Sequence, residues 1–185
     1  MLLKDKVQHC IENQIPIRLH LGCGPVKLPN YLNVDGEYCS GDPEIIIHDI
    51  ADVYPIPDNS VDEILSVHVI EHIERWKILP MLVEWRRILC PGAQVAVEWP
   101  DLLKACTFIA ENPDSLISDD RRILKKTINS IFGNSRYQNR AMMHAYGYSV
   151  ASMTRLFSEA GFSTVRSENN IYAKTASDSR VIGIK

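Results

Sequence analysis

Hydrophobic and polar residues alternate with two different periods along this chain, and each period predicts one type of element. Between Ile15 and Leu21 every second residue is apolar, which predicts a strand with one buried face. Further short apolar runs predict strands at 31–35, 45–47, 61–67, 94–99, 162–167 and 180–184. Apolar residues at helical spacing predict helices at 2–13, 77–89, 102–111, 119–132 and 149–160. Strands that alternate with helices favour an α/β domain with a mainly parallel sheet.

Two parts of the chain depart from this alternation. Too few residues separate the last two predicted strands for a helical crossover, so these strands are expected to pair antiparallel. After the strand at 94–99 the chain becomes helical and then irregular, with many Asn, Arg, Met and His residues. We therefore expect a single domain over residues 1–185, in which 101–148 form a helical insertion that covers the site as a lid. A loop is expected at 37–43.

A turn with two glycines, Gly22 and Gly24, follows the strand that ends at Leu21. Two such glycines also suit an ordinary turn, but they let the backbone approach a ligand closely because they have no Cβ atom. A dinucleotide site needs a third glycine where this chain has Lys27, and an acid about twenty residues further on. The acid here, Asp35, comes much sooner, and no Gly-Lys-Ser/Thr phosphate loop is present. The turn therefore favours a nucleoside over a dinucleotide.

Polar residues follow three predicted strands at the same place, their carboxyl ends: Asp35, Asp49 and His68. Ligands of open parallel sheets bind in the crevice beyond these ends. An acid buried there needs partners, which a ligand could supply. Asp35 could accept both hydroxyls of a ribose because a carboxylate has two acceptor oxygens. Asp49 could accept from an exocyclic amine while Ile50 packs on the base. Together these residues favour an adenosine-containing ligand.

Composition narrows the class of protein. The chain has 185 residues, of which 45% are hydrophobic and 23% charged, as in ordinary soluble globular domains. The net charge is −3 and no long basic run is present, so neither nucleic acid nor a membrane surface is an expected partner. The N-terminus has no apolar signal core and no run could span a bilayer, so we expect a cytoplasmic protein.

The cysteines argue against covalent or metal cross-links. There are five of them, and no pair has the C-x-x-C spacing of a zinc ribbon. An odd number also disfavours a disulfide framework. They are Cys10, Cys23, Cys39, Cys90 and Cys106.

In its motifs the chain resembles the class I S-adenosylmethionine-dependent methyltransferases, and among them the small group labelled type 11. The resemblance begins with Leu19-His20-Leu21-Gly22-Cys23-Gly24. It continues in order through 28–35, 48–50, 55–62, 68–72, 87–93 and 159–162. The early block is specific because of the short link from the glycine turn to the acid. The family often has an acid or Asn where this chain has His20, and many relatives have glycine where it has Asn30.

The resemblance implies a Rossmann-like, doubly wound, seven-stranded sheet that is mostly parallel with an antiparallel last strand. It implies S-adenosylmethionine as cofactor, with the Gly22–Gly24 turn under the methionine end, Asp35 on the ribose, and Asp49 and Ile50 at the adenine. The region of His68 would hold the methionine portion. The candidate cofactor-binding residues are His20, Leu21, Gly22, Cys23, Gly24, Asp35, Asp49, Ile50, His68 and Val69.

Methyl transfer from a sulfonium is an in-line displacement, so the protein must align an acceptor and, where needed, remove its proton. The candidate catalytic bases are Asp101, which follows the fifth strand, and His144, which lies where a segment could cap the cofactor. Asp101 would equally suit a helix N-cap, and His144 a packed histidine. His68 and His72 are weaker candidates. No metal site is expected, because His68 precedes the helix on which His72 would lie.

Three functions remain open on these grounds. The first is a methyltransferase for a small-molecule or saccharide acceptor. Motifs typical of DNA methyltransferases, such as Asn-Pro-Pro-Tyr or Pro-Cys after the fourth strand, are missing. The second is a non-catalytic S-adenosylmethionine-binding module with a regulatory or interaction role. The third, a nicotinamide-dependent oxidoreductase, is disfavoured by the missing third glycine. The sequence does not indicate the acceptor atom or the oligomeric state.

Overall fold

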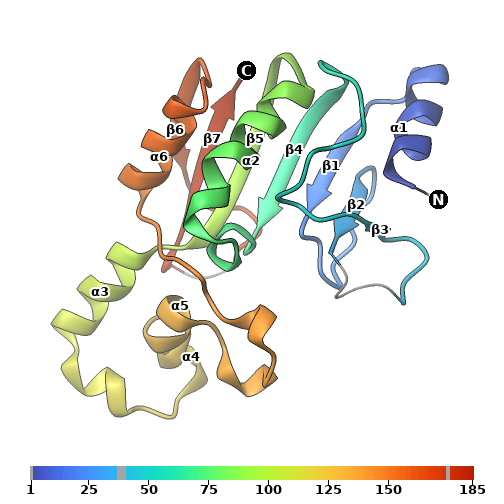
Figure 1. The fold of residues 1–185 in the computed structure, drawn as a ribbon. Coiled ribbons are helices and arrows are strands. Elements are labelled where there is room, and N and C mark those ends of the chain that lie inside the picture. Colours follow the sequence, from blue (N-terminus) through green and yellow to red (C-terminus); the bar gives the residue numbers. More distant parts are fainter. Residues whose placement is uncertain (1, 37–40, 174–175) are drawn as a thin grey trace.

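The computed structural model describes residues 2–36, 41–173 and 176–185 of the chain, so Cys39 and part of the loop expected at 37–43 lie outside the described residues. Its centre is a seven-stranded sheet with the order β3-β2-β1-β4-β5-β7-β6 (Figure 1). The strands are β1 (Arg18–Leu21), β2 (Leu32–Asp35), β3 (Ile46–Ile47), β4 (Val61–Val67), β5 (Leu89–Pro100), β6 (Thr164–Glu168) and β7 (Asp178–Ile184).

The strand directions confirm the expected mixed sheet. Strands β1 to β5 are mutually parallel, and β7 runs antiparallel to both of its neighbours, β5 and β6. Leu19 lies opposite Leu32 on one side and Ile64 on the other, so β1 and β4 are adjacent at the centre of the sheet. The sheet order reverses between these two strands. Such a switch point opens a crevice beyond the carboxyl ends of the strands.

The main core lies on one face of the sheet. Helices α1 (Leu3–Glu12), α2 (Arg75–Ile88) and α6 (Val150–Glu159) share one buried cluster with the side chains of Leu19 and Ile64. A strand alternates its side chains between two faces, so Leu65 points the other way. It forms a smaller buried cluster with Ala96 and Ile182. The sheet therefore has a buried apolar cluster on each face.

A helical segment connects β5 to α6 and lies, in Figure 1, below the arrowheads of β1 and β4. It contains α3 (Leu102–Glu111), α4 (Arg121–Leu124), α5 (Ile128–Phe132) and three short 3₁₀ helices, η3 (Pro113–Ile117), η4 (Ser135–Tyr137) and η5 (Arg140–Met142). A further 3₁₀ helix, η2 (Ile70–His72), follows β4. This segment therefore lies on the side of the sheet where the crevice opens.

One predicted helix is divided in the structure. The helix expected at 119–132 is broken into α4 and α5 because Thr127 has φ −123° and ψ −107°, which no helix accommodates. The Thr127 hydroxyl donates to the carbonyl of Ile123, and the Ser130 hydroxyl donates to that of Lys125. Hydroxyl groups compete in this way with backbone donors, and this competition weakens a helix.

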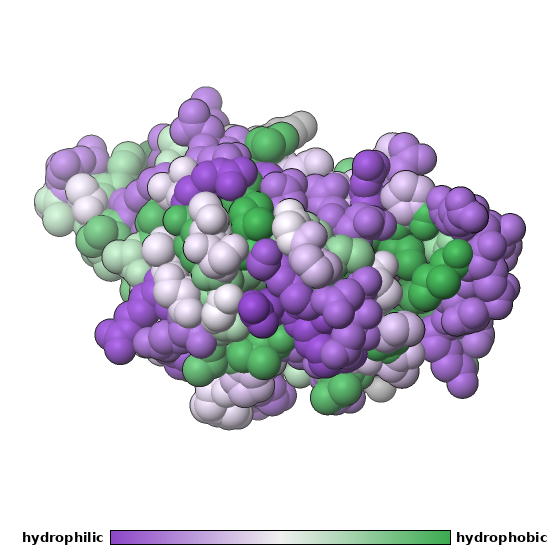
Figure 2. Space-filling model, turned by 90° about the horizontal axis from the view of Figure 1, so that it is seen from above, coloured by the Kyte–Doolittle hydropathy of each residue, from purple (hydrophilic) through white to green (hydrophobic). Residues whose placement is uncertain are grey.

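The surface seen from above, on the side away from α4 and α5, is mostly hydrophilic with smaller hydrophobic areas between (Figure 2). Among the described residues, no helix has the length and apolar character that crossing a membrane requires.

Candidate functional site

A cavity of about 820 Å³ lies at the carboxyl ends of the central strands. Its lining comes from the turn after β1, the ends of β2 and β3, the segment after β4, and the helical segment beyond the sheet. The lining residues are Gly22, Gly24, Pro25, Asp35, Gly36, Ile47, Asp49, Ile50, His68, Val69, His72, Ile73, Tyr137, Ala141 and Met142. Pockets for small ligands have volumes of about 300–1,000 Å³, so this cavity has the size for a nucleoside-sized ligand.

The glycine turn forms one wall of the cavity. Gly22 has φ +72°, and a Cβ atom there would lie 2.1 Å from Val69 Cγ2, so only glycine fits. Gly24 has φ +51° with nothing within 4 Å of the place of a Cβ atom. Its N–H donates to Asp35 Oδ2 over 2.7 Å. This bond fixes the carboxylate at the edge of the cavity, while its other oxygen keeps its acceptor capacity.

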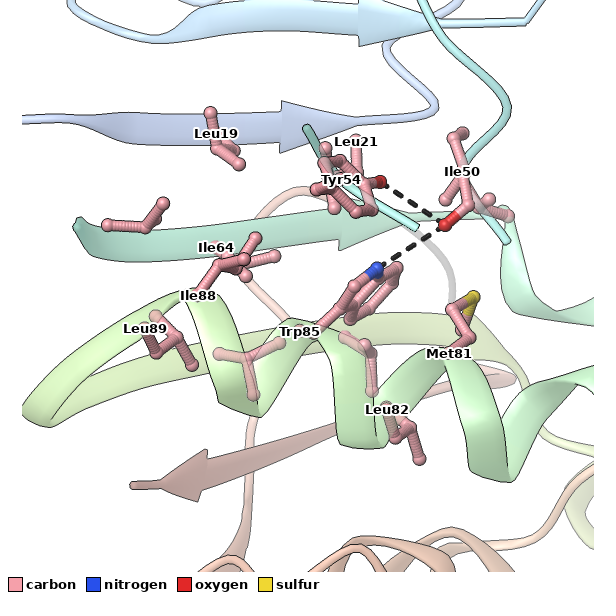
Figure 3. Packing of buried hydrophobic residues seen from close by; sticks show 14 of the residues in the cluster. Leu19, Leu21, Ile50, Tyr54, Ile64, Met81, Leu82, Trp85, Ile88 and Leu89 are labelled. Carbon is pink, nitrogen blue, oxygen red and sulfur yellow. Dashed lines mark hydrogen bonds between the residues drawn. The ribbon is translucent and has the colours of Figure 1, made fainter. Parts of the chain in front are cut away.

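The loop after β3 brings Asp49 and Ile50 to the lining of the cavity. The Ile50 carbonyl accepts hydrogen bonds from Tyr54 Oη at 3.2 Å and from Trp85 Nε1 at 3.4 Å (Figure 3). Tyr54 and Trp85 are fully buried, and Trp85 belongs to α2. The loop is therefore anchored in the main core. Asp49 Oδ1 accepts from the backbone N–H of Ala51, which keeps the acid at the start of this turn.

His68 lies where β4 ends, with a φ angle of +55° that is uncommon for residues other than glycine. Its ring is partly exposed and stands between two buried carboxylates. Nδ1 lies 3.2 Å from Glu71 Oε1, and Nε2 lies 3.6 Å from Asp178 Oδ2. The surrounding protein opposes protonation, but the two carboxylates outweigh this effect and raise the pKa of His68 to about 10. The ring is therefore cationic at neutral pH.

Three of the predicted cofactor-binding residues do not line the cavity. Leu21, at the end of β1, and Cys23, within the turn, are both buried, and His20 is 4% exposed on β1. His20 Nδ1 lies 3.1 Å from Asn33 Oδ1, which also accepts from the backbone N–H of Leu28. Burial lowers the pKa of His20, although Asn33 and Asp35 act in the opposite direction. The structure thus places His20 in a neutral, internal hydrogen-bond network.

The two predicted catalytic bases have different surroundings. Asp101 is 2% exposed and caps α3, where Oδ1 accepts from the N–H groups of Leu103 and Lys104. Its Oδ2 accepts from the Ser179 hydroxyl at 2.7 Å. Asp101 is not among the lining residues of the cavity, and its catalytic role stays a prediction.

His144 lies beside the cavity without lining it. Its ring packs edge-on against His72, which does line the cavity, with ring centroids 4.9 Å apart. Nδ1 lies 3.1 Å from the Ser130 carbonyl, and burial is the main reason why the pKa of His144 is lowered. The structure brings His144 to within reach of Glu71 as well. Its role as a base also stays a prediction.

Sequence reasoning missed some residues that lie at the site. Tyr137, Ala141 and Met142 line the cavity from the helical segment, although no local pattern marks them as ligand-binding. The grouping of Glu71, His72 and His144 was also missed. The only signal was the pair Glu71-His72 after the fourth strand, because His144 is far away in sequence.

Comparison with known proteins agrees with this geometry. Residues 19–97 match the profile of a family described as a methyltransferase domain. Those residues run from β1 into β5 and include the glycine turn, Asp35, Asp49 and His68. No protein in a search of curated sequences matches the chain.

Solved structures share the fold. A SAM-dependent methyltransferase from Archaeoglobus fulgidus has a TM-score of 0.61 at 15% identity, with 99% of this chain and 93% of that chain covered. A second, from Thermotoga maritima and described as a possible histamine N-methyltransferase, has a TM-score of 0.53 at 16% identity, with coverage of 97% and 87%. A structure described as PigF with SAH has a TM-score of 0.51 at 14% identity, with 97% of this chain and 53% of that chain covered. At such identities the likeness establishes the fold alone.

Proposed function

We propose that this chain, in which residues 19–97 match a methyltransferase-domain profile, is a class I S-adenosylmethionine-dependent methyltransferase of the type 11-like group and transfers the cofactor's methyl group to a small-molecule or saccharide acceptor. The observation that carries the proposal is the order of groups along the cavity. The glycine turn comes first, Asp35 lies next to it, and Asp49 with Ile50 lies at the end of the following strand. This order matches the methionine, ribose and adenine parts of the cofactor.

The residue roles follow from this placement. Asp35 binds the ribose hydroxyls, because the Gly24 N–H occupies only one of its oxygens. Ile50 packs on the adenine and Asp49 accepts from its amine. Gly22, Gly24, His68 and Val69 surround the methionine end. The side chains of His20, Leu21 and Cys23 are buried and do not contact the cofactor. They support the glycine turn, whose backbone is the part that can reach the cofactor.

The acceptor would enter beside the helical segment. We propose that this segment, residues 101–148, acts as a lid over the cavity. Tyr137, Ala141 and Met142 contribute its inner surface. The lid is joined to the wall after β4, because the backbone N–H groups of Ala145 and Tyr146 donate to the Glu71 carbonyl. The mixture of aromatic, apolar and polar groups and the net charge of −3 favour a small or sugar-like acceptor over a polyanion. His144, next to this cavity, is the better placed candidate base.

The cofactor assignment is tested by calorimetry with S-adenosylhomocysteine. Wild type should bind it, and Asp35→Ala should bind roughly ten times more weakly or worse, since hydrogen bonds to a charged group contribute about 1.5–3 kcal/mol. Asp114→Ala, which changes an exposed acid of η3, is the matched control and should bind like wild type. Absence of binding to wild type would refute the cofactor site, and full binding to Asp35→Ala would refute the ribose role.

The acceptor class is tested separately. Protein supplied with S-adenosylmethionine labelled in the methyl group is incubated with a metabolite and glycan extract and, in parallel, with nucleic acid. Label should appear in the small-molecule or glycan fraction. Transfer to nucleic acid alone would contradict the proposed acceptor class.

A further inference from the structure

Two histidines and one glutamate converge beside the cavity, from two parts of the chain. Glu71 and His72 belong to η2, directly after β4, and His144 lies in the helical segment. One potential ligand atom from each of the three side chains lies within 4.8 Å of the others. His72 also lines the cavity. The cluster is thus at the boundary between the sheet and the segment that covers it.

Hydrogen bonds fix the tautomer of the imidazole rings of His72 and His144. His72 Nδ1 lies 3.1 Å from the carbonyl of Met143, and His144 Nδ1 lies 3.1 Å from the carbonyl of Ser130. A carbonyl oxygen only accepts hydrogen bonds, so each Nδ1 donates a proton to it. In the neutral rings the lone pair is therefore on Nε2. Histidine ligands of metal ions are oriented in this way, through a bond from the second ring nitrogen to a carbonyl or carboxylate.

A buried carboxylate oxygen of Glu71 that lacks a hydrogen-bond partner points independently to a bound cation. It is 1% exposed, and its Oε2 atom is buried with no hydrogen-bond partner among the described residues. Its other oxygen, Oε1, is 3.2 Å from His68 Nδ1 and 4.0 Å from His72 Nε2. An unpaired buried carboxylate oxygen is costly, and a cation placed between it and the two rings would remove that cost.

The backbone holds this arrangement in place. The Glu71 carbonyl accepts from the N–H groups of Ala145 and Tyr146 over 2.7 and 3.2 Å. Glu71, which supplies the carboxylate, is therefore hydrogen-bonded directly to the segment that contains His144. A cluster built from sequence-distant residues and joined by backbone bonds is set by the fold and does not result from the chance meeting of flexible side chains.

We propose that Glu71, His72 and His144 bind one divalent transition-metal ion of the zinc type. Two imidazoles and one carboxylate are a typical ligand set of catalytic zinc sites, in which a further position stays open. Zinc–ligand distances are about 2.0–2.2 Å, so ligand atoms lie about 3–3.5 Å apart, and the three side chains would close slightly around the ion. Because His72 lines the cavity, the ion would lie at the edge of the cavity, and its open position would be available to a molecule bound there. With the ion bound, His144 is a ligand, so its proposed role as a base applies only to the metal-free protein.

One consequence rests on the proposed function. A hydroxyl of the acceptor bound at the open position would lose its proton to water more readily, since zinc lowers the pKa of bound oxygen ligands. Its oxygen would then form the bond to the methyl carbon while the bond between that carbon and sulfur breaks. The sulfur would keep the electron pair, and S-adenosylhomocysteine would leave. The site thus favours an oxygen acceptor.

The site is tested by titration of untagged protein, freed of metal with a chelator and then dialysed, with Zn²⁺ in a calorimeter. Co²⁺, whose visible absorption reports its coordination, is the second probe. Wild type should bind one ion per chain. His144→Ala and His72→Ala should each weaken Zn²⁺ binding at least about tenfold, since even indirect partners of a metal ligand change affinity 10–100-fold. His9→Ala, an exposed histidine of α1, should leave it unchanged.

S-adenosylhomocysteine binding is measured on the same samples as a test of folding that does not depend on the metal. A variant that binds S-adenosylhomocysteine but not Zn²⁺ supports the site. No stoichiometric Zn²⁺ binding to wild type, equal affinity in His144→Ala, or loss of Zn²⁺ binding only in Cys106→Ser would overturn it. Wild type that binds Zn²⁺ but not S-adenosylhomocysteine would leave the metal site standing and refute the proposed function. The reverse result would refute only the metal site.

Discussion

At the scale of single residues, the positive φ angles of Gly22 and His68 shape the wall of the cavity. Gly22 at +72° adopts its angle without steric cost, whereas His68 at +55° carries a strain of about 1–3 kcal/mol. The strain is held by the ring contacts of His68 with Glu71 and Asp178 and by the bond from its N–H to the Glu98 carbonyl. Strain of this kind occurs at binding sites, where surrounding structure enforces it.

Gly22→Ala should destabilise the protein more than its backbone angle alone explains. The new Cβ atom would lie 2.1 Å from Val69 Cγ2, so Val69 or the turn must move. Gly92→Ala is the matched control, because Gly92 has φ +80° but nothing within 4 Å of the place of its Cβ atom. We expect Gly22→Ala to lose about 1–3 kcal/mol more unfolding free energy than Gly92→Ala in urea titrations. Equal losses would contradict the contact with Val69.

His20 should make stability depend on pH. Its folded-state pKa is lowered below the ordinary 6.5, so the unfolded chain takes up a proton first as the pH falls. The stabilisation is therefore complete above about pH 6.5 and is lost as the pH drops through the folded pKa. The decrease in unfolding free energy from about pH 7 to 5 should be smaller in His20→Gln, which keeps a donor for Asn33. An identical decrease in His20→Gln and wild type would contradict this.

At the scale of elements, one buried carboxylate joins β5, β7 and the loop between β6 and β7. Glu98 is fully buried on β5 and accepts from Arg180 Nη1 on β7 over 2.6 Å. It also accepts from the backbone N–H groups of Ile171, Tyr172 and Ala173. The backbone carbonyl of Glu98 accepts a hydrogen bond from the N–H of His68 and so positions that residue. The antiparallel edge of the sheet is thereby coupled to the cavity.

Glu98→Gln should destabilise the protein by about 3–5 kcal/mol, because it leaves Arg180, which is 5% exposed, as an uncompensated buried charge. Glu159→Gln, which breaks the exposed pair with Arg155 on α6, should change stability by about 0.5 kcal/mol or less. The unfolding free energies of the two variants and of wild type are measured by denaturant titration. A loss in Glu98→Gln as small as that in Glu159→Gln would show that the buried pair is dispensable.

At the scale of the whole molecule, the cavity lies between a rigid sheet and a segment of short helices. The sheet side is anchored in the main core through Tyr54 and Trp85 (Figure 3). The other side is joined to the sheet through contacts that include the backbone bonds from Ala145 and Tyr146 to Glu71 and the contact of His72 with the Met143 carbonyl. Segments with few buried apolar contacts open more easily than cores. A ligand in the cavity should therefore affect the segment more than the sheet.

Hydrogen exchange should report this difference. On addition of S-adenosylhomocysteine, amides in 134–146 should exchange more slowly, because Tyr137, Ala141 and Met142 line the cavity. Amides of α1, which packs in the main core and does not line the cavity, serve as the internal control and should not change. Slower exchange in the glycine turn without any change in 134–146 would contradict the role of this segment as a lid.

Much of the fold could be predicted because the relevant signals are local. The bounds of β4 and α3 agree with the predicted 61–67 and 102–111, since an uninterrupted period reports one buried face. Ser149 caps α6 as expected, and Gly161, with φ +90°, ends it. Asn30 adopts a φ of +64°, which asparagine tolerates better than most other residues.

The sequence by itself determined the strands, the glycine turn and the acids at the strand ends, because each depends on residues close together in the chain. Only the tertiary structure decided which polar groups face the cavity. It turned His20 inward to Asn33, engaged both oxygens of Asp101, and brought His144 to Glu71 and His72. These outcomes depend on contacts between segments that are distant in sequence. Such contacts leave no periodic signal, because they are fixed by how the layers pack and which donors remain unpaired.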